Sequence, residues 1–111
     1  MTAAILVKAS TSRPLKIEWT ETAKTHLLGL DAYLYERSPT GAVRVVDQIY
    51  DAVGRLEQFL FAGRLGRVAG TREMVVTTTR YIVAYRVHKE VLQILAVMHG
   101  AQRWPRHFSG T

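Results

Sequence analysis

The chain has 111 residues, of which 48% are hydrophobic and 22% charged, with no cysteine and a formal net charge of +6. This length fits one domain, and this composition can bury a core, which argues against a disordered chain. The lack of cysteine excludes a disulfide framework and a thiolate metal site, and it suits a reducing cytoplasm. The apolar run at residues 3–7 is too short to span a membrane, so residues 1–14 are predicted to be a tail or an extra edge strand.

The positive charge gathers in the second half of the chain. Residues 1–60 carry seven basic and seven acidic side chains, whereas residues 61–111 carry eight basic and two acidic ones. One region of the fold should therefore attract anionic partners, either nucleic acid or an acidic protein.

The first half predicts a strand followed by two helices. Residues 15–19 alternate between apolar and polar side chains, as a half-buried strand does. Thr20 can cap a helix that ends at Ser38-Pro39, and a second helix is predicted from Ala42 to Leu60. The connection of residues 38–41 is short, so the helices should pair as a hairpin. The stripes that support the helices are Ala23, Leu27, Leu30 and Leu34 in the first, and Ala42, Val45, Val46, Ile49, Val53, Leu56 and Leu60 in the second.

From Gly63 onward the apolar period changes to two. Strands are predicted at Met74–Val76, Tyr81–Val87 and Val91–Met98, with reversals at residues 77–80 and 88–89. The last strand is apolar on both faces apart from Gln93, which is typical of a central strand covered on both sides. The sequence predicts a two-layer α+β domain over residues 15–105, with a helical hairpin on one face of an antiparallel meander, and a C-terminal tail at residues 106–111.

The sheet face away from the helices is predicted to be the functional site, because arginines lie at its approaches. Guanidinium groups bind phosphates and carboxylates bidentately, although a solvated rim would carry the same residue type. Trp104 could stack on a base or anchor a protein contact, or it could close the core after the last strand. Gly63, Gly66 and Gly70 match no nucleotide-binding fingerprint and are predicted to permit turns. The arginines concerned are Arg64, Arg67, Arg72, Arg86 and Arg103.

A histidine follows the last predicted strand and raises the possibility of phosphodiester chemistry. His99 could act as a general acid or base, with Arg103 holding a phosphate and Glu73 as a complementary base. A histidine in this position is more often a hydrogen-bonded structural residue. The other histidines have no metal-ligand spacing with His99, so neither a metal site nor a cofactor is predicted.

The chain resembles the RelE/ParE superfamily of bacterial type II toxin-antitoxin systems over residues 15–105. The order and spacing of several short segments carry this resemblance. They are Ile17-Glu18-Trp19, Ser38-Pro39, Gly63-Arg64-Leu65-Gly66-Arg67-Val68, Gly70-Thr71-Arg72-Glu73-Met74-Val75-Val76, Tyr81-Ile82-Val83-Ala84-Tyr85-Arg86-Val87 and residues 94–105, which include His99-Gly100-Ala101-Gln102-Arg103-Trp104-Pro105.

The resemblance implies a cytoplasmic toxin that binds a cognate acidic antitoxin in a heteromeric complex. Members similar to ParE inhibit DNA gyrase, whereas members similar to RelE cut messenger RNA in the ribosome. Gly100-Ala101 stands where a nuclease would place a late basic residue, which favours gyrase inhibition. A nuclease would use Arg72, Arg86, His99 and Arg103, and binding to a target is assigned to Arg64, Arg67 and Trp104. Whether the chain is an enzyme stays open. A further alternative is an attenuated toxin whose main activity is to bind the antitoxin.

Overall fold

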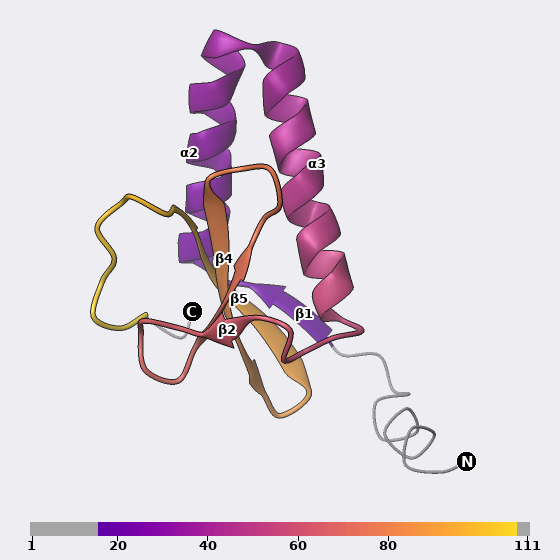
Figure 1. Ribbon diagram of the computed structural model, residues 1–111, viewed down its shortest axis with the longest axis vertical. Helices are drawn as coiled ribbons and strands as arrows, with labels where there is room; N and C mark the ends of the chain where they lie inside the picture. The colour runs from indigo at the N-terminus through magenta and orange to yellow at the C-terminus, as the bar shows by residue number, and fades with distance from the viewer. Residues whose placement is uncertain (1–15, 109–111) are drawn as a thin grey trace.

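The computed structural model describes residues 16–108, so the predicted N-terminal tail lies outside the described residues. Figure 1 shows two helices side by side as a hairpin, with the strands gathered at one end of it. The predicted α+β architecture of strand, helical hairpin and strands is confirmed. The elements in chain order are β1 (Lys16–Trp19), α2 (Glu21–Arg37), α3 (Pro39–Leu56), β2 (Arg64–Leu65), β3 (Arg72–Val75), β4 (Tyr81–His88) and β5 (Val91–His99).

The strands form one sheet in the order β1-β5-β4-β3-β2. The predicted meander is confirmed, because β3, β4 and β5 pair antiparallel in sequence. The first strand joins this meander in parallel, with Ile17 opposite Leu92 of β5. The two-residue strand β2 was not predicted, since its segment reads as a glycine-spaced loop, and it extends the sheet beyond β3.

The helix boundaries follow from two capping side chains. The Thr20 hydroxyl accepts a hydrogen bond from the backbone N–H of Ala23 at 3.1 Å, as predicted. Ser38 ends α2 and caps α3 by accepting from Gly41 N–H at 3.0 Å. The prediction that α3 runs from Ala42 to Leu60 is wrong at both ends. Proline suits the first turn of a helix, where its missing N–H has no partner to lose, so α3 starts directly after Ser38 and leaves the hairpin almost no linker.

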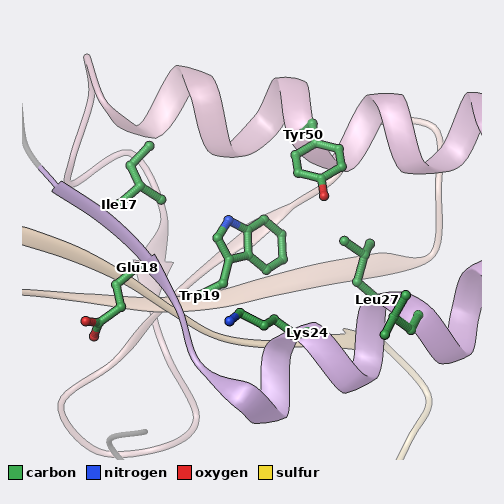
Figure 2. Close-up of a pocket in the computed structure, with 7 residues that line it drawn as sticks. Ile17, Glu18, Trp19, Lys24, Leu27 and Tyr50 are labelled. Atoms are coloured by element: carbon green, nitrogen blue, oxygen red, sulfur yellow. The ribbon is translucent and has the colours of Figure 1, made fainter.

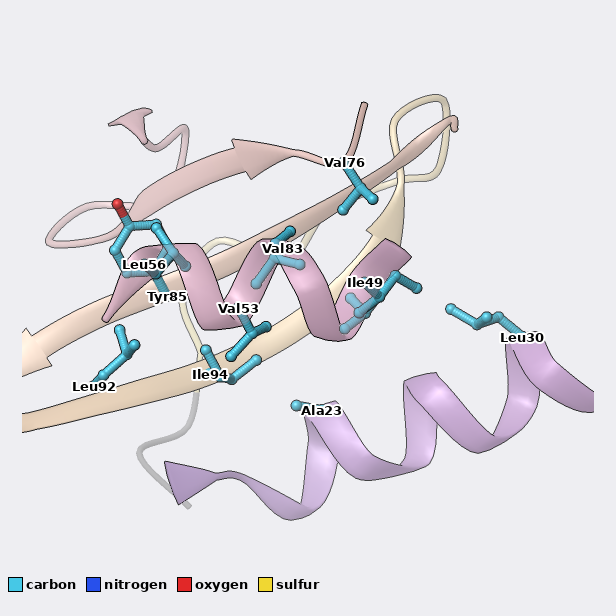
Figure 3. Close-up of a cluster of buried hydrophobic side chains, with 12 residues drawn as sticks. Ala23, Leu30, Ile49, Val53, Leu56, Val76, Val83, Tyr85, Leu92 and Ile94 are labelled. Carbon is cyan, nitrogen blue, oxygen red and sulfur yellow. The ribbon is translucent and has the colours of Figure 1, made fainter. Parts of the chain in front are cut away.

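The main core lies between the helical hairpin and one face of the sheet, as Figure 3 shows. Both helices, the strands β4 and β5 and the residue that follows β3 contribute to it, and the side chains are apolar apart from one tyrosine hydroxyl. The members are Ala23, Leu30, Ile49, Ala52, Val53, Leu56, Val76, Val83, Tyr85, Leu92, Ile94 and Val97.

The second face of the sheet is also covered. Trp104 and Phe108 pack on a smaller buried cluster of Ala84, Leu95, Ala96 and Met98. The expectation that this face is left uncovered is therefore wrong over this cluster. The two alanines leave room for the indole, and residues of the predicted C-terminal tail contribute Phe108. The prediction that β5 is covered on both sides is confirmed, because its residues 92–98 are all buried.

A buried tyrosine joins the sheet to the loop after α3. The Tyr85 hydroxyl accepts a hydrogen bond from Gly63 N–H at 3.0 Å and donates one to Leu60 O at 2.8 Å. A methyl group on Gly63 would lie 2.7 Å from the Tyr85 hydroxyl and 2.7 Å from the backbone oxygen of Glu73. Gly63 is thus required by close packing, whereas Gly70 has a positive φ of 79°.

We predict that Gly63→Ala lowers the free energy of unfolding by about 2 kcal/mol, because the added methyl group overpacks a buried site. Gly54→Ala is the matched control, since no atom lies within 4 Å of its added methyl group in α3. That variant should raise the free energy of unfolding by about 0.5–1 kcal/mol through helix propensity. Urea denaturation of both variants measures the difference, and equal stabilities would contradict the packing argument.

Candidate functional site

An apolar groove opens where β1 meets the two helices. Its volume is about 620 Å³. Figure 2 shows Ile17 and Trp19 of β1 on the side of the helices, with Tyr50 of α3 and Leu27 of α2 around them. The Trp19 and Tyr50 rings lie 5.6 Å apart at 51°. The remaining lining residues are Glu18, Lys24 and Leu28.

The helix α2 exposes apolar side chains that the core does not use. Leu28 of the groove is 70% exposed, and Tyr33 and Tyr35 are also exposed. Since β1 is the first strand in the sheet order, its outer edge is paired with no strand of the described chain. An apolar groove beside an open strand edge is the typical form of a protein-binding surface.

Two arginines of the basic half bind a carboxylate of the same chain. Glu73 of β3 is 2% exposed and accepts hydrogen bonds from the side chains of Arg64 and Arg67 and from Arg67 N–H, at 2.8–3.3 Å. Burial raises the pKa of the Glu73 carboxyl, but the hydrogen bonds from Arg67 and Arg64 outweigh it and lower the pKa below its ordinary value. A carboxylate held in this way is a poor proton acceptor, which weighs against Glu73 as a general base.

Trp104 lies against the same cluster. The Arg67 guanidinium stacks over the Trp104 ring at 3.9 Å from its centroid, and the Phe108 ring meets the indole edge-on. The Trp104 indole N–H is buried and has no hydrogen-bond partner within residues 16–108. Of the three residues assigned to binding, the structure thus brings Arg67 and Trp104 into contact, with Arg64 joined to them through Glu73.

His99 forms the turn that follows β5. Its Nδ1 accepts a hydrogen bond from Ala101 N–H at 3.1 Å, and its own backbone N–H donates to the Gln102 side chain. Its ring meets the Tyr81 ring edge-on, with centroids 5.6 Å apart. These contacts match the structural role considered for this histidine. Arg103, four residues later, is exposed.

The four residues assigned to a nuclease do not gather at one place. Arg86 pairs with Gln93 near one end of the β4–β5 ladder, whereas His99 pairs with Tyr81 at the other end. Five residues of strand, at about 3.3 Å each, separate these ends by about 16 Å. Arg72 lies near Arg86 and donates to Gly63 O at 2.8 Å. A single phosphate could therefore not contact Arg86 and His99 together in this arrangement.

The described residues give no sign of a metal centre or a membrane span. Within residues 16–108, no group of three or more His, Asp or Glu side chains is placed to hold a metal ion. Neither of the two helices is long and apolar enough to cross a membrane.

The fold is that of a small, basic, two-layer α+β domain with an apolar groove beside an open strand edge. A family described as the ParE toxin of the type II toxin-antitoxin system parDE matches residues 17–104. The chain therefore belongs to the ParE toxin family. The resemblance found in the sequence is confirmed at the level of the superfamily, and the family implies an antitoxin as partner.

Two relatives extend this assignment. The chain is 41% identical over 91 residues to "Putative toxin Y4kP" of Sinorhizobium fredii, a match that covers 82% of this chain and 94% of the relative. It is also similar to a solved structure titled "Chromosomal ParDE TA system from P. aeruginosa", with a TM-score of 0.71 and 25% identity. That likeness covers 77% of this chain and 95% of the solved one.

Sequence reasoning missed the groove. Its lining comes from β1, α2 and α3, and no pattern within one element reveals such a junction. One signal was present, however. Leu27 and Leu28 are adjacent, so a helix that buries Leu27 must turn Leu28 outward.

His26 joins α2 to the free edge of β5. Its Nδ1 accepts a hydrogen bond from Val97 N–H at 3.2 Å, and β1 pairs only with residues 91–94 of that strand. Burial lowers the pKa of His26 below its ordinary value of 6.5. The folded state therefore favours the neutral imidazole, which is the form that can accept this hydrogen bond.

We predict that the protein loses stability as the pH falls below about 6.5, because the unfolded state then binds a proton that folded His26 resists. The contribution of His26 to the free energy of unfolding is complete above that pH. Glu73, with a lowered pKa, loses its contribution only from about pH 4.5 downward, so the two effects occupy different ranges. Thermal melting of the wild type and of His26→Gln between pH 7.5 and 5 tests this, and parallel curves would contradict it.

Proposed function

We propose that the chain arrests growth by inhibiting DNA gyrase in the cytoplasm, and that a cognate antitoxin blocks it. The proposal rests on membership of the ParE family together with the wide separation of His99 from Arg86. A toxin that acts by binding needs contact surfaces rather than one converged set of catalytic groups. The apolar groove and the exposed side of α2 are surfaces of that kind.

We assign the groove to the antitoxin. A toxin must be released for action, so its inhibitor needs a surface where a flexible chain can fold on binding. The groove provides the half-buried Trp19 indole, the exposed Tyr50 ring beside it and the Leu28 side chain, and aromatic side chains dominate such contacts. The open edge of β1 can add main-chain hydrogen bonds to an extended segment.

The purified protein, free of antitoxin, should inhibit supercoiling of relaxed plasmid by DNA gyrase, and its induction in cells should raise the DNA-damage response. Addition of antitoxin should restore supercoiling. Unchanged supercoiling together with messenger RNA cut inside ribosomes would overturn the proposal in favour of a RelE-like nuclease. In that case His99→Ala and Arg103→Ala should abolish the arrest, whereas a gyrase inhibitor that does not use these side chains should keep it.

Leu28→Arg should weaken antitoxin binding by about tenfold or more, because it puts a charge at an apolar contact that is desolvated in the complex. Val43→Arg is the matched control, since Val43 is a similarly exposed apolar residue of α3 that does not line the groove. Isothermal titration with purified antitoxin measures both. Equal losses for the two variants, or none for Leu28→Arg, would remove the groove from the antitoxin interface.

A further inference from the structure

A second hollow lies at the opposite edge of the same end of the sheet. The strand β3 begins at Arg72, which pairs with Tyr85, so β4 extends three residues beyond it. Residues 86–88 pair with β5 on one side and with no strand of the described chain on the other. We call the resulting space of about 390 Å³ the notch. Its lining residues are Phe61, Leu65, Gly66, Gly70, Thr71, Arg72, Arg86 and Val87.

The lining of the notch indicates the chemistry of its occupant. Two of the lining side chains are guanidinium groups and none is acidic. Phe61 and Leu65 are 67% and 77% exposed, so an apolar side chain could also be buried there. An exposed strand edge presents main-chain donors and acceptors that an added extended segment can satisfy. Acidic side chains, an apolar residue and an extended backbone together describe a polypeptide. A nucleic acid could pair with the guanidinium groups and stack a base on Phe61, but it has no peptide backbone that could continue the sheet at residues 86–88.

Arg86 is held in position for this role. Its Nε donates to the Gln93 side-chain oxygen at 2.7 Å, and the Gln93 amide donates to Glu18 at 2.9 Å. The bond to Gln93 uses only Nε, so the two terminal nitrogens are available for a bidentate contact with a carboxylate. A guanidinium that is already oriented loses less side-chain entropy when a partner binds.

The same hydrogen bonds connect the notch with the groove. Glu18 lines the groove and Arg86 lines the notch, with Gln93 of β5 between them. Only β1, β5 and β4 make up this end of the sheet, so its two open edges lie two strand spacings apart, about 10 Å. One polypeptide chain could therefore contact both edges.

We propose that the notch receives an extended acidic segment of the antitoxin, so that one antitoxin chain holds this three-stranded end of the sheet from both edges. The inference rests on the proposed antitoxin partnership and deepens it. Carboxylates of the segment pair with Arg72 and Arg86, an apolar side chain packs on Phe61 and Leu65, and its backbone pairs with residues 86–88 of β4.

Titration of the purified protein with antitoxin, at about 0.05 M and 0.3 M salt, tests the charge pairing. Arg86→Gln should weaken binding about tenfold at low salt and flatten the salt dependence, and Arg72→Gln with Arg86→Gln should weaken it further. Arg80→Gln is the matched control, because Arg80 is exposed in the turn before β4, at the other end of that strand, and it should bind within about twofold of the wild type. Arg86→Gln removes the hydrogen bond to Gln93 but no contact to the loop after α3, and urea denaturation of the variant separates lost binding from lost folding.

Hydrogen exchange tests the strand pairing. Amides of residues 86–88 that exchange in the free protein should become protected in the complex. Unchanged binding by both arginine variants, or no added protection, would overturn the inference alone and leave antitoxin binding at the groove intact. Variants that bind antitoxin normally but lose retention of a short single-stranded RNA would overturn it in favour of a phosphate site. An antitoxin that does not bind the wild type would overturn the proposed partnership itself.

Discussion

The buried carboxylate of Glu73 decides how the half of the fold without helices is arranged. An unpaired charge at a site 2% exposed would cost several kcal/mol, so Arg64 and Arg67 must come to it. Arg64 brings β2 against β3, and Arg67 folds the following loop back along the sheet. Arg67 then stacks on Trp104, which holds the C-terminal segment over the second face. The short strand β2, the loop that follows it and the C-terminal segment on the second face are thus all linked to one ion cluster.

The helices and the longer strands could be predicted because their apolar periods are long enough to be distinctive. The stripe on α3 and the alternation of β4 follow directly from which side chains face the core. A two-residue strand such as β2 contains no period at all. The segment that covers the second face of the sheet could not be predicted for a similar reason. Its two packing residues, Trp104 and Phe108, lie within an otherwise polar segment. The sequence nevertheless required such a cover, because β5 is apolar on both faces.

The candidate site was harder to predict, because a count of arginines does not say where each guanidinium is directed. Glu73 lies six and nine residues from Arg67 and Arg64, and only the turn between β2 and β3 brings them together. Charge that seemed free for a partner is therefore partly neutralised inside the chain. The groove could not be predicted because its walls belong to three separate elements, β1, α2 and α3. Such junctions depend on how elements pack rather than on a local sequence pattern.

The positive charge of the second half is therefore not a single binding face. Arg86 lies toward one end of the β4–β5 pair and Arg80 directly precedes its other end, while Arg64 and Arg67 are paired with Glu73. Charge dispersed in this way attracts acidic partners over a distance and speeds their encounter, but it does not select among them. Selection needs contacts that exclude water, and we propose that the groove and the notch make them at two edges of one three-stranded end. Because Glu18, Gln93 and Arg86 already connect these edges, a partner that uses both finds its polar contacts oriented before it binds.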